Sequence, residues 1–306
     1  MSQSSSSGPV ASEFKYDLLL LLAAAIWGTG FVAQRLGLRV LPPIAFNGAR
    51  FGLGALALIP FILLRRTTFQ ALRKAAGPAV LAGFVIAIAA NLQQIGMQST
   101  GAGKAGFITG LYVVLVPITA IFLGKRTSVR TWLGAGLALI GLFLLSVTGN
   151  FTMERGDFII FVSAFFWTAH ILVLDHWAHR VDVIALTAMQ FAVCSVVSWA
   201  IAFPVETFAA RDFITGIGPV LYGGLVSIGI GFTLQTIGQT KAHPARASII
   251  LSMEATFAVL AGWLILGEIL SVREISGCAL MFAGIILAQL PGRMVAPPST
   301  GLSATD

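Results

Sequence analysis

The stretch Ser252-Met-Glu-Ala-Thr-Phe-Ala-Val-Leu-Ala-Gly-Trp-Leu-Ile-Leu-Gly-Glu268 decides the fold of this chain. It forms most of a predicted membrane-spanning helix over 244–266, with one acidic residue, Glu254, inside it. At 1.5 Å rise per residue, Glu254 lies about 12 Å along the helix from Arg246 and about 21 Å from Glu268. That depth is inside a hydrocarbon core about 30 Å thick.

A carboxyl group at this depth costs at least about 2.5 kcal/mol on insertion scales, so it needs a partner, a cavity or a proton. The functional interpretation is that Glu254 belongs to a binding or transport site. The alternative, which stays open here, is a neutral acid that a neighbouring backbone group or hydroxyl satisfies.

The composition requires a membrane. Charged residues make up 10% of the 306 residues and hydrophobic ones 57%, whereas a soluble domain averages about 25% charged. The net charge of +7 lies in short breaks between apolar runs, which indicates orientation in a bilayer and excludes a nucleic-acid partner. Cys194 and Cys278 fall inside apolar runs and offer no disulfide framework. We therefore expect neither a metal site nor a cofactor.

Ten apolar runs have about the length that a helix needs to cross the bilayer. They cover 18–36, 42–64, 75–97, 104–124, 130–147, 157–174, 183–204, 216–238, 244–266 and 272–290. The fold class predicted is an all-α polytopic membrane protein with ten transmembrane helices. The flanking segments, 1–17 and 291–306, are rich in Ser or in Pro, Ser and Thr, and are expected to be disordered tails.

The breaks on the N-terminal side of the bilayer hold about twice as many Lys and Arg residues as the breaks on the other side. Basic loops stay in the cytoplasm, so this bias predicts a multi-pass protein of the cell (inner) membrane with both termini cytoplasmic.

The two halves of the chain repeat one another, with an offset that drifts only from 140 to 143 residues. The matches, in order, include Trp27 with Trp167, Phe51 with Phe191, Gln93 with Gln235, Gly134 with Gly277, and Gly141 with Gly284. The copies are 18–147 and 157–290, with five runs each. Because five is odd, the second copy enters the bilayer from the opposite side. Such inverted repeats place a substrate site near the midplane of transporters and allow alternating access; a rigid bundle is the alternative.

Three motifs carry a resemblance to a known family. They are Ile26-Trp-Gly-Thr-Gly-Phe-Val-Ala33, Arg50-Phe51 after Pro42-Pro43, and 254–268 followed by Gly277 and Gly284. Over 18–290 the chain resembles the EamA family of the drug/metabolite transporter superfamily. The resemblance implies ten helices and the export or exchange of small metabolites. The family often has proline after the intramembrane acid, and Ala255 at that position removes the expectation of a helix break there.

Helical spacing places aromatic and amide residues of several runs on shared faces. The candidates for substrate binding and transport are Trp27, Arg50, Asn91, Gln94, Tyr112, Trp167, His170, Gln235 and Glu254. Aromatic and amide linings suit amphipathic organic solutes such as amino acids. For the amides, contacts that hold helices together are the alternative, and for His170 it is a satisfied histidine of the core.

Arg50 is the second intramembrane charge. It lies about 22 Å along its helix from Arg65, in the opposite half of the bilayer from Glu254. The axial gap of about 10 Å argues against a direct pair. We expect Arg50 to support packing or attract an anionic group, and Glu254 to bind a proton or a substrate amine. Pro117 predicts a kink in the fourth run.

The sequence thus predicts a secondary transporter, most simply an exporter, for small organic metabolites. A passive facilitator, a membrane-embedded enzyme and an assembly scaffold are the alternatives. The motifs H-E-x-x-H and G-x-S-x-G are absent, which disfavours an enzyme. The chain has no phosphate loop, so transport would use a gradient or an exchange, with protons as the candidate ion. Besides the solute and the lipid bilayer, a homodimer partner stays open.

Overall fold

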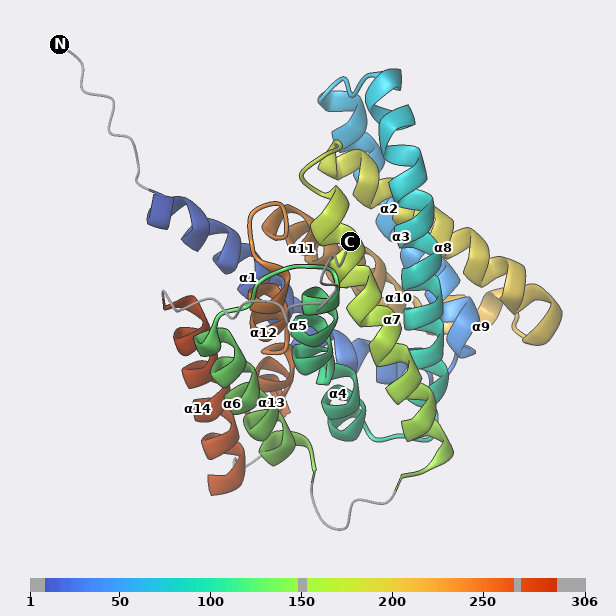
Figure 1. Cartoon of the computed structure of the whole chain (residues 1–306). Helices are drawn as coiled ribbons and strands as arrows, with labels where there is room; N and C mark the ends of the chain where they lie inside the picture. Colours follow the sequence, from blue (N-terminus) through green and yellow to red (C-terminus); the bar gives the residue numbers. More distant parts are fainter. Residues whose placement is uncertain (1–8, 148–152, 267–270, 291–306) are drawn as a thin grey trace, which may run out of the picture.

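A computed structural model describes residues 9–147, 153–266 and 271–290 (Figure 1). Within these ranges all regular secondary structure is helical. Nine of the described helices are long and apolar enough to cross a membrane, and a shorter apolar helix, Val129–Leu145, supplies the tenth span. The predicted all-α fold with ten spans is therefore confirmed.

The spans have the following bounds. Those of the first copy are α1 (Pro9–Gly37), α2 (Pro43–Leu64), α3 (Phe69–Gly96), the pair α4 (Ala102–Gly110) and α5 (Tyr112–Phe122), and α6 (Val129–Ser146). Those of the second copy are α7 (Arg155–Trp177), α8 (Val183–Val205), the series α10 (Ile217–Leu221), η1 (Tyr222–Phe232) and α11 (Thr233–Gly238), the pair α12 (Pro244–Leu251) and α13 (Glu254–Leu266), and α14 (Val272–Gln289). A short helix, α9 (Ala210–Thr215), precedes α10.

The helix ends agree with the predicted runs to within three residues except at the starts of α1 and α3, and α3 begins at Phe69, six residues before the predicted start at 75. Helix α1 begins at Pro9, well before residue 18. Residues 1–8 of the first predicted tail, the second predicted tail at 291–306, and Glu268 lie outside the described residues.

Large apolar side chains on the outside of the bundle stay exposed, as a lipid-facing surface requires. Examples are Leu56 (61%), Ile140 (53%), Val196 (67%) and Ile286 (61%). The interior holds buried clusters, one of which joins α1 to α5, α6 and α12–α14 and another joins α2 and α3 to α8 and η1. The chain therefore has apolar residues on both its inside and its outside, which explains its composition.

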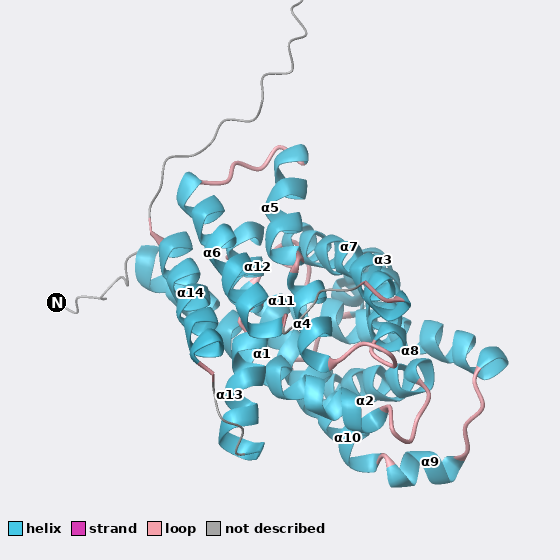
Figure 2. Cartoon of the chain, turned by 90° about the horizontal axis from the view of Figure 1, so that it is seen from below, coloured by secondary structure: helices cyan, strands magenta, loops and turns pink. Residues whose placement is uncertain are grey.

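Helices α6 and α14 show that the copies are inverted; they lie side by side in both views (Figures 1 and 2). An added Cβ on Gly134 would lie 2.5 Å from the carbonyl oxygen of Gly284, and one on Gly141 would lie 2.6 Å from that of Gly277. Residue numbers rise along one helix as they fall along the other, so the helices are antiparallel. Exchanging each residue for its repeat equivalent reproduces the same two contacts.

Ion pairs obey the same symmetry. Lys104 pairs with Asp157, where α4 meets α7. Their repeat equivalents, Arg246 and Asp17, pair at 3.1 Å where α12 meets α1. Equivalent contacts therefore tie the two copies together at both ends of the bundle.

The fourth and ninth spans are interrupted at equivalent positions. The fourth breaks at Leu111, between α4 and α5, and the ninth at Ser252 and Met253, between α12 and α13. At each break a backbone N–H donates to the carbonyl three residues earlier instead of four. The hydrogen bonds are Leu111 N to Ile108 O (3.3 Å) and Met253 N to Ile250 O (3.1 Å).

One expectation, that of a continuous ninth span, is corrected by the structure. The absence of proline at 255 did not keep the ninth span continuous; the Ser252 hydroxyl donates to the Ile249 carbonyl (2.8 Å), a local bond that competes with regular helix. In the fourth span the interruption lies at Leu111; Pro117 lies inside α5, and the kink expected there stays a prediction. Interrupted spans in corresponding positions of two copies are typical of transporter binding sites.

Candidate functional site

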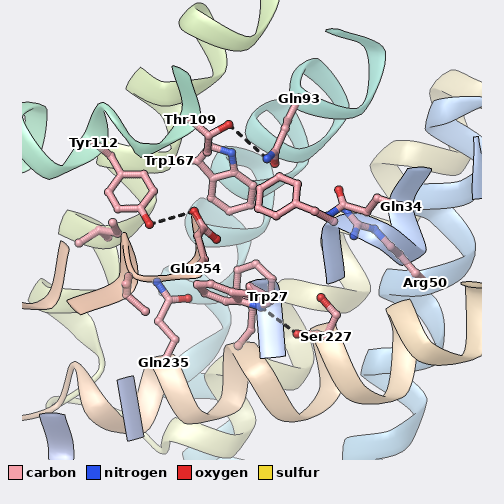
Figure 3. A pocket seen from close by; sticks show the side chains of 14 residues that line it. Trp27, Gln34, Arg50, Gln93, Thr109, Tyr112, Trp167, Ser227, Gln235 and Glu254 are labelled. Atoms are coloured by element: carbon pink, nitrogen blue, oxygen red, sulfur yellow. Dashed lines mark hydrogen bonds between the residues drawn. The ribbon is translucent and has the colours of Figure 1, made fainter. Parts of the chain in front are cut away.

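A pocket lies between the two copies beside the interrupted spans (Figure 3). It holds about 540 Å³ of space free of protein atoms, open solvent at its mouth included. Its lining is aromatic and polar, and comprises Trp27, Phe31, Gln34, Arg50, Gln93, Thr109, Tyr112, Trp167, Ile171, Ser227, Phe232, Gln235, Leu251 and Glu254. Spans of both copies supply these residues, so the site exists only where the copies meet.

Glu254 and Tyr112 are the first residues of α13 and α5, directly after the two breaks. The Tyr112 hydroxyl donates to Glu254 Oε1 at 3.1 Å, and the side chains are 4% and 6% exposed. The dipole of a helix favours an acidic side chain in its first turn, and Glu254 occupies that position in α13. The breaks therefore present an acid and a phenol to the pocket at equivalent points of the copies.

Arg50 lies on the far side of the pocket from Glu254 (Figure 3). Its Nε donates to Asn47 Oδ1 at 2.8 Å, and its guanidinium lies 5.4 Å from the ring centre of Phe46 and 5.3 Å from that of Phe51. Arg50 and Glu254, the two intramembrane charges named above, form no ion pair with each other. The pocket thus offers a cationic group and an acid at separate places.

A cluster of packed aromatic rings also lines the pocket. The Phe232 ring centre is 4.5 Å from that of Trp27 and 5.9 Å from that of Trp167, which it stacks against at 23°. Trp27 Nε1 donates to the Ser227 carbonyl at 3.1 Å, within the π-helix η1. The wider turns of a π-helix alter the usual backbone pairing, which is consistent with a carbonyl available to a side chain.

Several polar atoms of the lining have no protein partner. The Oε1 atoms of Gln34 and Gln235 are buried and unpaired, and so is the indole N–H of Trp167. Gln93, by contrast, donates to the Thr109 hydroxyl at 3.2 Å. Because buried polar groups normally have hydrogen-bond partners, these two acceptors and one donor indicate contacts with water or a solute.

The pocket contains six of the nine predicted site residues, namely Trp27, Arg50, Tyr112, Trp167, Gln235 and Glu254. The other three lie outside its lining. Asn91 accepts from Asn47 (2.8 Å) and donates to Ser198 (2.9 Å). Gln94 donates to the backbone of Gln34 (3.5 Å).

His170 is the third residue outside the lining. Its Nε2 bonds to Gln190 Oε1 at 3.0 Å, and its ring lies edge-on to Trp167 and Phe232, with centroid distances of 6.1 and 6.0 Å. It therefore lies directly behind the aromatic wall of the pocket.

Sequence analysis did not select Phe232, the aromatic residue between the two tryptophans. Its repeat equivalent is Ala90, so the repeat gave no matching aromatic. Gln93 was also missed, although its equivalence to Gln235 could have identified it. In the described part of the chain, no group of three or more His, Cys, Asp or Glu residues is placed to hold a metal.

The pocket extends toward one end of the bundle. Gln34 and Arg50 line it, while their repeat equivalents, Leu174 and Gln190, are fully buried outside it. We name the two ends by the helices that meet there. The α1–α2 end lies where α1 ends and α2 begins, and the α7–α8 end is its counterpart in the second copy. The pocket therefore reaches farther toward the α1–α2 end than toward the α7–α8 end.

Ten spans in two inverted copies around a polar and aromatic pocket define a membrane transporter. The chain belongs to the EamA-like transporter family, which matches it over residues 14–147 and 154–290, once in each copy.

Individual relatives agree with this assignment. A protein named "Uncharacterized transporter" from Archaeoglobus fulgidus is 30% identical over 90% of this chain and 85% of its own length. A protein of Chlamydia muridarum named "S-adenosylmethionine/S-adenosylhomocysteine transporter" is 26% identical, covering 82% of this chain and 84% of its own. A chain solved by crystallography has the same fold, with a TM-score of 0.77, 19% identity, and coverage of 90% and 96%.

Proposed function

We propose that this protein is a secondary transporter that exports small organic metabolites such as amino acids by alternating access around the pocket between its two copies. The observation that carries the proposal is the Tyr112–Glu254 pair at the pocket wall, directly after two equivalent helix breaks. Interrupted helices supply polar groups at the midplane of transporters. The direction of export rests on the family resemblance.

The chemistry of the lining supports a solute with both charged and apolar parts. Arg50 suits a carboxylate because its guanidinium is always charged and directional. Glu254 and the free acceptor of Gln235 suit an ammonium group. The packed rings of Trp27 and Phe232, which also line the pocket, suit an apolar or aromatic side chain.

Glu254 is the proposed site of proton coupling. Membrane-embedded acids are typical members of proton relays, and this one lies on a pocket wall that both copies build. The proposed orientation places both termini in the cytoplasm, on the bias of Lys and Arg. The α1–α2 end, toward which the pocket extends, then faces outward.

The test is flux of a radiolabelled panel through proteoliposomes that contain the purified protein. The panel comprises aromatic, aliphatic and basic amino acids, S-adenosylmethionine and an uncharged sugar, with and without a pH gradient. We expect at least one amino-acid-like solute to move faster than in empty liposomes, and the gradient to drive its accumulation. If none of the panel moved in either condition, the proposed solute class would be wrong.

A passive facilitator is the second candidate, and the polar pocket would serve it as well. It would equilibrate a solute without accumulating it when a pH gradient is imposed. The same experiment therefore separates the two candidates.

A further inference from the structure

Arg50 and Gln190 occupy equivalent positions in the two copies, 140 residues apart. The packing confirms the equivalence. A Cβ added to Gly224 would lie 3.0 Å from the Arg50 carbonyl oxygen, and one added to Gly83, its equivalent, would lie 2.9 Å from the Gln190 carbonyl oxygen. Yet Arg50 lines the pocket and Gln190 does not.

Most of the pocket lining obeys the repeat. Five equivalent pairs have both members in the lining, namely Trp27/Trp167, Phe31/Ile171, Gln93/Gln235, Thr109/Leu251 and Tyr112/Glu254. Exchanging the conformations of the two copies leaves these pairs in place. The other four lining residues, Gln34, Arg50, Ser227 and Phe232, have equivalents outside the lining. The exchange would send Arg50 and Gln34 to the buried places that Gln190 and Leu174 now occupy.

The surroundings of Gln190 contain unpaired polar atoms. Gln190 Oε1 bonds to His170 Nε2 at 3.0 Å, but Gln190 Nε2 and His170 Nδ1 are buried without partners. The equivalent of His170 is Gly30, where an added Cβ would already lie 3.2 Å from Ser227 Oγ, so the first copy has no counterpart of the imidazole. Unpaired buried polar atoms are unfavourable, and a second conformation that hydrates them would explain their retention.

We propose that Gln190 and His170 enter the pocket wall in the state open to the α7–α8 end, while Arg50 withdraws from it. This inference rests on the alternating access proposed above. In that state the Gln190 amide takes the place that the Arg50 guanidinium has in the pocket wall, and the His170 imidazole takes the place of Gly30. The pocket consequently attracts an anionic group, such as the carboxylate of a solute, more strongly from the α1–α2 end than from the other.

The test uses Gln93→Cys as a reporter, in a background with Cys194→Ser and Cys278→Ser. Its rates of reaction with anionic 2-sulfonatoethyl methanethiosulfonate and cationic 2-trimethylammonioethyl methanethiosulfonate are measured from each face of oriented membrane vesicles. The ratio of the two rates cancels the intrinsic reactivity of the thiol. We expect this anionic-to-cationic ratio to be about tenfold higher from the α1–α2 end, a modest effect for local electrostatic attraction.

Two further variants identify the residues responsible. Arg50→Gln is expected to lower the ratio at the α1–α2 end to the value at the other end. Gln190→Arg is expected to raise the ratio at the α7–α8 end by about tenfold, because the new guanidinium enters the wall in that state. An unchanged thermal unfolding temperature checks that each variant is folded.

A second reporter, Gln235→Cys, separates failure of this inference from failure of alternating access. Both reporters belong to a pair that lines the pocket in either state, so both should react from both faces. Reaction from one face only would contradict alternating access itself. Reaction from both faces, with a ratio at the α7–α8 end that Gln190→Arg leaves unchanged, would overturn the inference about Gln190.

Discussion

Tyr112 donates a hydrogen bond to Glu254 at 3.1 Å, and the two residues are repeat equivalents, 142 positions apart. An operation that exchanges the two copies would exchange the acid and the phenol with each other. The pair therefore lies where the approximate two-fold axis of the fold crosses the pocket. In our account the pair stays at the wall in both facing states, which is what a group that carries a proton across requires.

Tyr112→Phe is expected to remove the donor and leave the buried Glu254 carboxyl with one hydrogen bond fewer. The loss should lower the free energy of unfolding by about 1–3 kcal/mol and reduce the transport rate. Thermal unfolding in detergent and proteoliposome flux measure the two effects. Tyr16→Phe, outside the pocket, is the control. Equal stability and flux in both variants would show that the Tyr112–Glu254 bond has no role.

The two pocket tryptophans should differ although they are repeat equivalents. Trp27→Phe removes the indole N–H that donates to the Ser227 carbonyl, so we expect the free energy of unfolding to fall by about 1–3 kcal/mol. Trp167→Phe removes an unpaired N–H, and should weaken solute binding about three- to tenfold with little change in stability. Unfolding temperatures and the KM of the transported solute check this. The opposite assignment of the two effects would contradict the geometry.

Two neighbouring glycines of α6 test the contact between the copies. Gly134→Ala places a Cβ 2.5 Å from the Gly284 carbonyl oxygen, an overlap that should cost about 1–3 kcal/mol. Gly136→Ala is the matched control, because nothing lies within 4 Å of its added Cβ. The control should be neutral or gain up to about 1 kcal/mol from helix propensity. Identical unfolding temperatures for the two variants would argue against the close contact of α6 with α14.

The ten spans could be predicted from the sequence because each apolar run is long enough to cross the bilayer. The repeat could be predicted because matching residues follow one another in the same order in both halves. The sequence also identified Glu254 and Tyr112, since an intramembrane acid is conspicuous and its repeat equivalent follows by counting. It did not indicate Phe232, which has alanine as its equivalent. His170 lies outside the pocket lining in this conformation, and its role in the site stays a prediction. The break before Glu254 has no proline beside it; the Ser252 hydroxyl donates to the Ile249 carbonyl there, a contact that the sequence pattern did not indicate.

The stability of the protein should depend on His243, which precedes α12 outside the membrane spans. Burial, and next the positive charge of Lys125, lower the pKa of His243 below its usual 6.5. Asp175 raises the pKa and Arg246 lowers it, with smaller effects. The unfolded chain then binds a proton more readily than the folded one, so this contribution is present above about pH 6.5 and is lost as the pH falls below it.

We therefore expect the unfolding temperature of the wild type to fall more steeply below about pH 6.5 than that of His243→Gln, which cannot titrate at this position. Unfolding scans of both proteins between about pH 8 and pH 5 make the comparison. Parallel curves would show that His243 has the same proton affinity in both states.

The central claim is that Glu254 couples a proton to the movement of solute through the pocket. Glu254→Gln keeps the size of the side chain and its ability to accept from Tyr112, but cannot exchange a proton. The direct measurement is accumulation of the transported solute in proteoliposomes under an imposed pH gradient. We expect the wild type to accumulate the solute and the folded variant to show no accumulation driven by the gradient. Equal accumulation by the wild type and Glu254→Gln would contradict the claim.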